Sequence, residues 1–189
     1  MTNEEMLEAL KDAGAILDGH FVLTSGRHSD TYIQCARVLE DPALTTLLAE
    51  EVVARLGEQD IDLVVAPAVG GIIFGFAVAR AMGVPFVFSE REGGRMTLRR
   101  GFEIPADARV LIAEDVVTTG GSVAEVVDIV RACGAEVVGV VSIIDRGGAK
   151  AFSDELHALL VLETVSWGAE ECVLCADGMP TSSPGSRRL

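Results

Sequence analysis

The chain has 189 residues, a formal net charge of −14 and a hydrophobic share of 49%, with few aromatic side chains. This length fits one domain with a conventional core, and the negative charge argues against general binding to nucleic acid or to an anionic membrane surface. No apolar run reaches the roughly 20 residues that cross a bilayer, and the acidic start MTNEEMLEAL is unlike a signal peptide, so the sequence predicts a cytoplasmic protein.

The first sixty residues are expected to form a small N-terminal unit. Residues 3–17 repeat apolar side chains at helical spacing behind a capping Thr-Asn pair, which predicts an amphipathic helix. Residues 20–35 alternate apolar and polar positions around a Ser-Gly dipeptide, which is typical of a β-hairpin. An Asp-Pro pair then predicts a second helix over residues 42–56, because Pro is well tolerated in the first helical turn.

From residue 61 onward, apolar strands alternate with helical segments, a pattern typical of βαβ units and a parallel sheet. Strands are expected over 61–71, 84–90, 108–116 and 135–146, helices over 71–82 and 121–134, and a last helical piece and strand within 153–164. Residues 166–189 are rich in Gly, Pro and Ser, and we expect a loosely attached tail anchored by Trp167. The predicted fold class is α/β, a single globular domain with an N-terminal helix and hairpin (1–60), an α/β core (61–165) and the tail (166–189).

Three loops rich in small or charged residues follow predicted strands, over 66–71, 114–122 and 145–148. Ligands of open α/β sheets bind beyond the carboxyl ends of the strands. Because parallel strands end at the same edge of a sheet, we expect these three loops to converge on one site.

The stretch VLIAEDVVTTGGS, residues 110–122, places two acids directly after a buried strand. Burial of two unpaired carboxylates is unfavourable, so Glu114 and Asp115 should face solvent, a cation or hydroxyl donors. Residues 118–122 then offer hydroxyls and free N–H groups at a helix start, which favours an anion. Acids beside a phosphate cradle suit a phosphorylated sugar. A plain capped turn is the alternative, although such a turn needs no acidic pair.

Basic side chains are concentrated in one ten-residue window around a Gly93-Gly94 bend: Arg91, Arg95, Arg99 and Arg100. A local cationic segment in an anionic protein indicates a small anionic ligand. A solvated surface hairpin is the competing interpretation.

The four cysteines fall into two classes. Cys35 and Cys133 lie in apolar surroundings and are expected to be small core residues. Cys172 and Cys175 form a C-x-x-C in the tail, which is half of a zinc site, and no second pair follows it. A dimer could complete four ligands, but reduced structural thiols are the expected state.

The segment VLIAEDVVTTGGS resembles the binding motif for 5-phosphoribosyl-1-pyrophosphate (PRPP) of type I phosphoribosyltransferases. Three further segments resemble the orotate phosphoribosyltransferases, namely the N-terminal FVLTSGRHSDTYIQ, the pyrophosphate loop VVAPAVGGIIFG and the strand end IIDRGG. The resemblance covers residues 21–148 and implies a type I phosphoribosyltransferase fold, a central, mostly parallel sheet flanked by helices with a small N-terminal hood. It also implies transfer of the phosphoribosyl group from PRPP to orotate in pyrimidine biosynthesis, with Mg²⁺.

The resemblance assigns roles residue by residue. PRPP would contact Gly70, Gly71, Arg91, Glu114, Asp115, Val116, Val117, Thr118, Thr119, Gly120, Gly121 and Ser122. Orotate would contact Arg27, Thr118 and Arg146. Catalysis would rest on Glu114, Asp115, Arg91, Arg95, Arg99 and Arg100, with the arginine segment acting as a lid shared across a homodimer. Mg²⁺ would be held through PRPP and water, with no direct protein ligand. His28 is a candidate for the base pocket, whereas His20 and His157 are expected at the surface.

The chain departs from the best-known members of that family in two places. Gly70 stands where those members have a lysine in the pyrophosphate loop. The lid sequence EREGGRMTLRRGFEI contains neither lysine nor histidine, so arginines would neutralise the pyrophosphate instead.

Two other functions fit the PRPP motif. A purine-salvage phosphoribosyltransferase would share it, but purine bases lack the carboxylate that Arg146 would bind. A regulator that binds PRPP without catalysis would need a DNA-binding element, and neither a basic helix nor a helix-turn-helix segment is evident.

Overall fold

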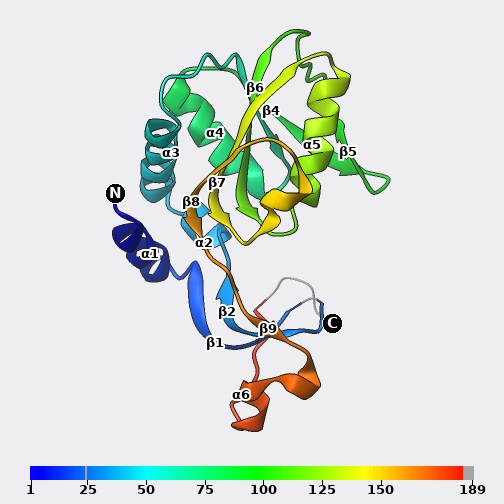
Figure 1. The fold of residues 1–189 in the computed structure, drawn as a ribbon. Coiled ribbons are helices and arrows are strands. Elements are labelled where there is room, and N and C mark those ends of the chain that lie inside the picture. The colour runs from blue at the N-terminus through cyan, green and yellow to red at the C-terminus, as the bar shows by residue number, and fades with distance from the viewer. Residues whose placement is uncertain (24, 185–189) are drawn as a thin grey trace.

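A computed structural model describes residues 1–23 and 25–184 and contains two β-sheets (Figure 1). The larger sheet has six strands and the smaller has three. Helices flank the larger sheet, and the smaller sheet lies below it in the view of Figure 1. The last five residues of the predicted tail lie outside the described residues.

The six-stranded sheet has the order β5-β4-β3-β6-β7-β8. All neighbouring strands are parallel except β4 and β5, which form an antiparallel hairpin. The strands are β3 (Leu63–Pro67), β4 (Phe86–Glu92), β5 (Arg95–Leu98), β6 (Arg109–Val117), β7 (Glu136–Asp145) and β8 (Leu156–Val161). The order reverses between β3 and β6, which is the switch point where ligands of such sheets bind. The predicted α/β class with a mostly parallel sheet is confirmed.

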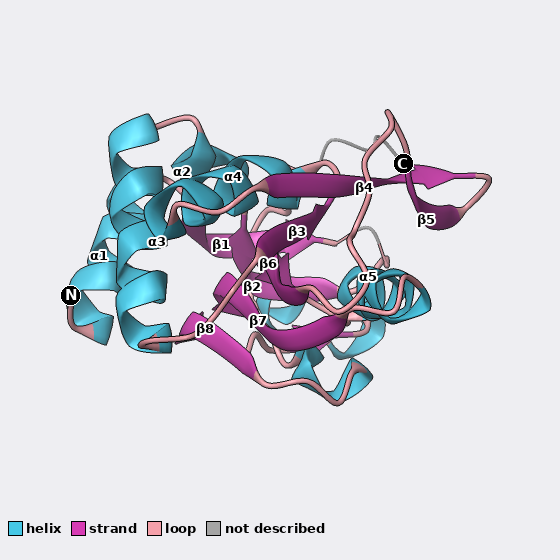
Figure 2. Ribbon diagram, turned by 90° about the horizontal axis from the view of Figure 1, so that it is seen from above, coloured by secondary structure: helices cyan, strands magenta, loops and turns pink. Residues whose placement is uncertain are grey.

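Helices cover both faces of the core sheet (Figure 2). Helices α3 and α4 pack on one face, and α5 packs on the other. The helices are α1 (Asn3–Asp12), α2 (Ala36–Leu39), α3 (Pro42–Leu56), α4 (Gly70–Met82), α5 (Gly121–Ala132) and α6 (Val173–Ala176), with two 3₁₀ turns, η1 (Gly148–Ala151) and η2 (Ala169–Glu171). Within the described part of the chain, no helix is long and apolar enough to cross a membrane.

The N-terminal helices show where local signals decide the structure. Helix α3 has the predicted bounds, because the Asp41 carboxylate accepts hydrogen bonds from the amides of Ala43 and Leu44. Helix α1 is capped by Thr2 in a capping box, but it ends at Asp12. The predicted helix over 3–17 is therefore too long. Residues 16–22 pair with β2 instead, and this strand pairing overrides the helical spacing of their side chains.

The core lies on both sides of strand β6. Residues 110–113 of this strand are fully buried, as expected of a strand covered on both faces. Alternate side chains contribute to the two clusters of buried residues, one under α3 and α4 and the other under α5. The two acids follow within the same strand, Glu114 still buried and Asp115 partly exposed.

The smaller sheet, called the hood here, consists of β1 (Ile16–Val22), β2 (His28–Ile33) and β9 (Ser166–Trp167), all antiparallel. The predicted hairpin is confirmed, and Trp167 pairs with His28. The prediction of a loosely attached tail is wrong for the described residues. Ser182 exchanges backbone hydrogen bonds with β1, since its amide donates to the His20 carbonyl and its carbonyl accepts from the Val22 amide.

Candidate functional site

The three loops at the carboxyl ends of β3, β6 and β7 converge, as their positions in the sequence predict. A Cβ atom built on Gly71 would lie 3.0 Å from the Ala113 carbonyl oxygen, so the β3 loop abuts β6. The Arg146 amide donates to the Val117 carbonyl oxygen at 2.8 Å, which joins the ends of β6 and β7. These contacts place one site at the switch point of the sheet.

Residues 118–122 form a small cradle at the start of α5. The cavity has a volume of about 80 Å³ and is lined by Glu114 and residues 116–123. Gly120 has a φ of +75°, and a Cβ there would lie 2.3 Å from the Gly148 carbonyl oxygen. Only glycine fits this combination of conformation and space. The N-terminal end of α5 therefore offers unpaired amides and a positive dipole to an anion.

The Asp115 carboxylate lies against the start of α4. A Cβ built on Gly70 would approach its Oδ1 to 2.6 Å and its Oδ2 to 2.9 Å. Asp115 also accepts a hydrogen bond from the Val116 amide at 2.9 Å. Any side chain at position 70 would therefore have to displace this carboxylate.

The two adjacent acids are not equivalent. Glu114 is only 8% exposed, whereas Asp115 is partly exposed. Burial, a hydrogen bond with Asp115 and the charge of Asp115 together raise the pKa of Glu114 to about 10. At neutral pH Glu114 therefore keeps its proton. Glu114 lines the cradle, whereas Asp115 lies against Gly70 at the start of α4.

Arg146 lies directly after β7 and is half-buried. Its Nη2 donates to the Thr164 hydroxyl at 2.6 Å, while its Nε is buried and has no hydrogen-bond partner among the described residues. Burial lowers the pKa of this guanidinium, and Tyr32 of the hood opposes that shift. A half-buried cation with a free donor needs an anionic partner, which a ligand carboxylate would supply.

Asp145, the neighbour of Arg146, does not form an ion pair with it and serves the following turn instead. The Asp145 carboxylate accepts hydrogen bonds from the amides of Gly147 and Gly148 at 2.8 and 2.9 Å. It therefore holds the turn that closes against Gly120. The Asp-Arg-Gly-Gly sequence contains the signal for this turn, because Asp side chains commonly accept from amides two residues on.

The arginine segment lies in and just after the β4–β5 hairpin, and most of its cations are paired, which agrees with the competing interpretation of a solvated surface hairpin. Arg91 contacts Glu125 of α5 at 2.8 Å and also donates to the Gly94 carbonyl oxygen. The other ion pairs are Arg99 with Glu92 at 3.6 Å and Arg100 with Glu90 at 2.7 Å. Arg95 has no ion pair within the described ranges. No hydrogen bond joins these arginines to residues 114–122 in that same part of the chain, so the structure does not bring the predicted lid residues to the cradle.

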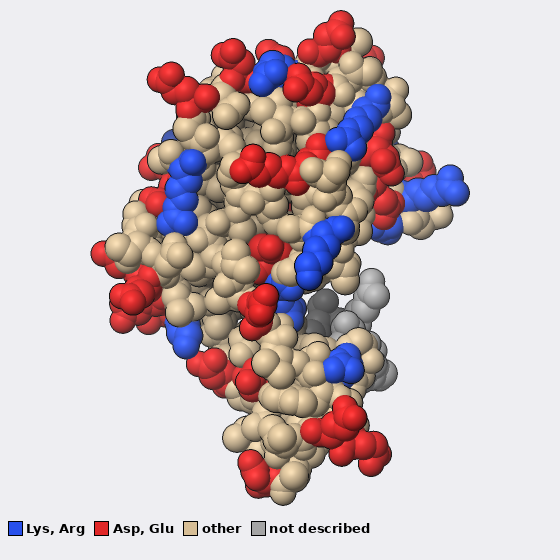
Figure 3. Space-filling model, in the orientation of Figure 1, with Lys and Arg blue, Asp and Glu red and all other residues tan. Residues whose placement is uncertain are grey.

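Arg27 lies in the turn between β1 and β2 and contacts the tail. Its Nε donates to the Ser166 hydroxyl at 2.9 Å, and its Nη2 donates to the Ser166 carbonyl oxygen. Figure 3 shows acidic side chains over much of the visible surface, with a few basic side chains beside the notch between core and hood. Within the hood, Ser166 therefore fixes the direction of the Arg27 side chain.

The histidine predictions need correction. His20 was expected at the surface but is 3% exposed, and His28 is buried beside it. The Nε2 atom of His20 lies 2.8 Å from Nδ1 of His28, so His28 faces another hood side chain. Strand alternation places both rings on one face of the hairpin, and the tail that covers them could not be inferred from the hairpin alone.

Comparisons with known proteins agree with this geometry. A family model described as the phosphoribosyl transferase domain matches residues 38–173. The chain is 49% identical to an orotate phosphoribosyltransferase of Chlorobaculum parvum, over 99% of this chain and 97% of that protein, and 49% identical to one of Pelotomaculum thermopropionicum over the full length of both. A crystal structure of orotate phosphoribosyltransferase from Aeropyrum pernix is similar to this structure with a TM-score of 0.72 and 28% identity, covering 84% of this chain and 94% of that one.

Proposed function

The chain belongs to the phosphoribosyltransferase family and, within it, to the orotate phosphoribosyltransferases, and on that premise we propose how its residues transfer the phosphoribosyl group of PRPP to orotate. The products are orotidine 5′-monophosphate and pyrophosphate, in pyrimidine biosynthesis. The observation that supports the residue assignment most strongly is the half-buried Arg146, whose Nε has no partner among the described residues, next to the cradle of residues 118–122.

The cradle binds the 5′-phosphate of PRPP in this proposal. Amides at the start of α5 and the hydroxyls of Thr118, Thr119 and Ser122 supply its hydrogen bonds. The ribose hydroxyls then reach Glu114 and Asp115 at the end of β6. The Glu114 proton is hydrogen-bonded to Asp115, and the remaining oxygens of the Asp115 carboxylate accept from the ribose hydroxyls.

Orotate lies against Arg146 and Thr118, with the orotate carboxylate on the free side of the guanidinium. Arginine suits this role because its planar fork binds a carboxylate through two parallel hydrogen bonds. Thr164 holds the other side of the guanidinium, so little side-chain freedom is lost when orotate binds. Arg27 approaches from the hood, where Ser166 fixes its direction.

The reaction needs no protein nucleophile. The bond from C1′ to pyrophosphate breaks, positive charge develops on the sugar, and the orotate ring nitrogen attacks C1′. The contribution of the chain is to position both substrates and to exclude water. Asp115 lies close to the developing positive charge and stabilises it, and the arginines of the β4–β5 hairpin neutralise the departing pyrophosphate.

Mg²⁺ fits this donor set. Magnesium prefers oxygen ligands and retains several waters, and the exposed oxygens at the site are the Asp115 carboxylate and the hydroxyls of the cradle. Bound to PRPP, the metal would neutralise phosphate charge and orient the pyrophosphate. The residue that would hold it, through ribose oxygens and water, is Asp115.

The active form is a homodimer in this proposal, with each β4–β5 hairpin closing over the site of the other subunit. Helix α4 supports an interface, because Ile73 and Phe76, one turn apart, are 50% and 59% exposed. The test mixes Asp115→Asn subunits with subunits in which all four hairpin arginines are alanine. A shared lid predicts recovered activity in the mixture, whereas a lid acting on its own subunit predicts none.

The orotate assignment is tested by Arg146→Ala. The KM for orotate should rise about 10- to 100-fold, the equivalent of one lost charged hydrogen bond, with a much smaller change in the KM for PRPP. Arg37→Ala is the matched control, because Arg37 forms an exposed ion pair with Glu40 in the hood-side helix α2 region, where both side chains are more than half exposed. Equal changes in both KM values would contradict the role of Arg146. Turnover of adenine or hypoxanthine in place of orotate would favour a purine-salvage enzyme.

A further inference from the structure

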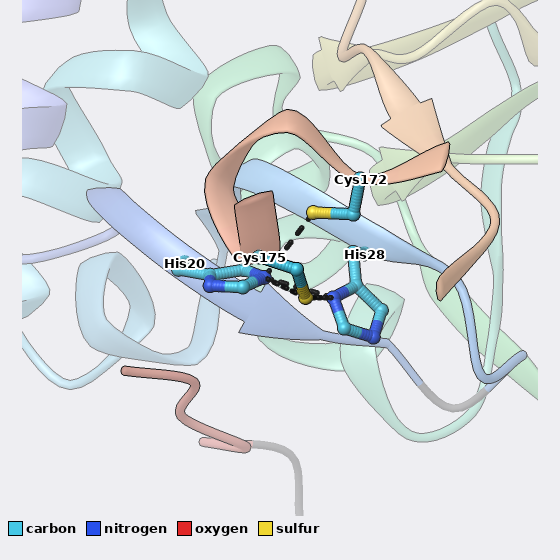
Figure 4. A group of neighbouring side chains, drawn as sticks. All are labelled: His20, His28, Cys172 and Cys175. Atoms are coloured by element: carbon cyan, nitrogen blue, oxygen red, sulfur yellow. Dashed lines mark hydrogen bonds between the residues drawn. The ribbon is translucent and has the colours of Figure 1, made fainter. Parts of the chain in front are cut away.

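A second cluster of chemically reactive side chains lies in the hood, away from the substrate site. It contains His20 from β1, His28 from β2, Cys172 at the end of η2 and Cys175 from α6 (Figure 4). One candidate ligand atom from each residue lies within 4.8 Å of all the others. The proposed chemistry of phosphoribosyl transfer uses none of the four.

The distances suit one tetrahedral metal centre. With zinc–nitrogen bonds near 2.0–2.1 Å and zinc–sulfur bonds near 2.3 Å, a tetrahedral centre separates a nitrogen from a sulfur by about 3.5 Å. The His20 Nε2 atom lies 3.4 Å from the Cys172 sulfur and 3.7 Å from the Cys175 sulfur. The His28 Nδ1 atom lies 3.4 Å from the Cys175 sulfur. The two nitrogens are 2.8 Å apart and would need to separate by about 0.5 Å.

The tautomer of His20 is set by the hydrogen bond that its Nδ1 atom makes outside the cluster. Its Nδ1 lies 2.8 Å from the Met179 carbonyl oxygen, which can only accept, so Nδ1 carries the proton. In the neutral ring, Nε2 then presents a lone pair to the other three side chains. A metal-binding histidine usually donates its second N–H in this way to a carbonyl or carboxylate, which fixes the ring.

The burial of the cluster also points to a metal. His20, His28 and Cys172 are buried, and only Cys175 is exposed. Thiols are weak hydrogen-bond donors, so two thiols and two rings satisfy one another poorly inside a small sheet. Two thiolates with two neutral imidazoles would balance the charge of one divalent ion, and this Cys₂His₂ set is typical of structural zinc.

We propose that His20, His28, Cys172 and Cys175 bind one structural Zn²⁺ that fastens the tail to the N-terminal hairpin. The C-x-x-C is half of the site, and the hairpin supplies the other half within the same chain. The histidine pair and the cysteine pair are more than 140 residues apart in sequence; His28 and Cys175, for example, are separated by 147 positions. Because the unfolded chain does not hold these ligands together, zinc would bind the folded state and stabilise it.

The zinc would also position a substrate-site residue indirectly. His28 is next to Arg27, and the tail segment that ends in the two cysteines begins at Ser166, which binds the Arg27 guanidinium. This consequence depends on the proposed orotate site, but the metal site itself does not. Loss of zinc would loosen the tail and leave Arg27 without a fixed direction.

The first experiment measures zinc in the full-length, untagged protein after exchange into buffer without free metal. We expect about one Zn²⁺ per chain in the native protein and in the control Cys133→Ser, whose partly buried thiol packs against the core just after α5. Cys175→Ser removes a ligand at an exposed position and leaves no cavity. It should bind zinc at least about 10-fold more weakly in competition with a chelator.

The second experiment replaces zinc with Co²⁺, which reports ligand type and geometry without reference to activity. A tetrahedral site with two thiolates predicts intense visible ligand-field bands and a thiolate-to-cobalt charge-transfer band in the near ultraviolet. The Cys133→Ser protein should retain both, and the Cys175→Ser protein should lose most of the charge-transfer intensity.

Three results would overturn the proposal. One is native protein that takes up no zinc even after incubation with an equimolar amount. Another is zinc content that is equal in the Cys175→Ser and Cys133→Ser proteins. The third is a Cys172–Cys175 disulfide in protein purified under reducing conditions. Orotate turnover is a separate readout, so failure of the zinc proposal would leave the proposed function untouched.

Discussion

Replacing Glu114 with glutamine should change how the stability of the protein depends on pH. Burial and Asp115 raise the pKa of Glu114 from an ordinary value of 4.5 to about 10, so the folded chain keeps a proton that the unfolded chain releases. The stability contributed by this proton is complete below about pH 4.5. It is then lost progressively as pH rises toward the folded-state value of about 10.

The magnitude follows from the difference in bound protons. One proton held only by the folded state lowers the free energy of unfolding by about 1.36 kcal/mol per pH unit, or about 2.7 kcal/mol between about pH 5.5 and about pH 7.5. Glutamine has the shape of the protonated acid and can donate the same hydrogen bond to Asp115, but it does not titrate. Glu114→Gln should therefore be stabilising relative to the native protein at both pH values, and by about 2.7 kcal/mol more at the higher pH than at the lower.

Urea unfolding of the ligand-free protein at the two pH values provides the assay. Glu8→Gln is the matched control, because Glu8 is exposed on helix α1 and its loss should leave the pH dependence of the native protein unchanged. A Glu114→Gln protein whose free energy of unfolding changes with pH in parallel with the native protein would refute the assignment of a retained proton to Glu114.

Three further predictions concern the cradle and the hairpin. Asp115→Asn should lower kcat/KM for PRPP about 10- to 100-fold while sparing the thermal unfolding temperature, and unchanged steady-state kinetics would remove Asp115 from the site. Gly120→Ala should destabilise the protein by about 1–3 kcal/mol in thermal unfolding, because its Cβ meets the Gly148 carbonyl. Gly83→Ala shares the positive φ but has open space, so a loss as large there would show that backbone strain alone is responsible. Glu125→Gln weakens the contacts of Glu125 with Arg91 and the Met96 amide, so hydrogen exchange over residues 93–98 should accelerate, and unchanged exchange would contradict a hairpin held by Glu125.

The sequence predicted the core sheet well because its signals there are local. Buried apolar strands, an Asp-Pro start and a glycine at the end of α4 each act within a few residues, and the observed elements follow them. Convergence of the three loops followed from the parallel sheet alone, since parallel strands end at one edge. The sequence therefore located this edge of the sheet without coordinates, but it did not indicate that Glu114 is buried, where both acids were expected to face solvent, a cation or hydroxyl donors.

The hood was predicted less well because its structure depends on contacts between distant parts of the chain. The helical spacing of residues 3–17 continues into β1, and only pairing with β2 ends the helix at Asp12. The tail looked loose from its composition, yet Ser182 and Trp167 pair with the hairpin. The burial of His20 depends on that pairing and could not be predicted from the hairpin sequence. For the same reason, the sequence did not predict that the two histidines lie beside the C-x-x-C.

For the arginine hairpin, composition predicted the charge of the segment but not the partners of its side chains. Composition identified four arginines suited to an anionic leaving group, but it did not indicate that three of them have acidic partners in the ligand-free protein. Each of these three arginines is neutralised by a glutamate, namely Glu125, Glu92 or Glu90. In a closed lid, contacts with pyrophosphate would have to replace these ion pairs. The exposed pairs are weak enough for this exchange.

Transfer of the phosphoribosyl group to orotate at Arg146 is tested most directly by the ultraviolet absorbance of orotate. The absorbance is followed after addition of PRPP, with and without Mg²⁺, for the native protein and for Arg146→Ala. The native protein should consume orotate only when both PRPP and the metal are present. Arg146→Ala should raise the KM for orotate much more than the KM for PRPP. Consumption of a purine base but not orotate, or turnover that is indifferent to Arg146, would contradict transfer to orotate at Arg146.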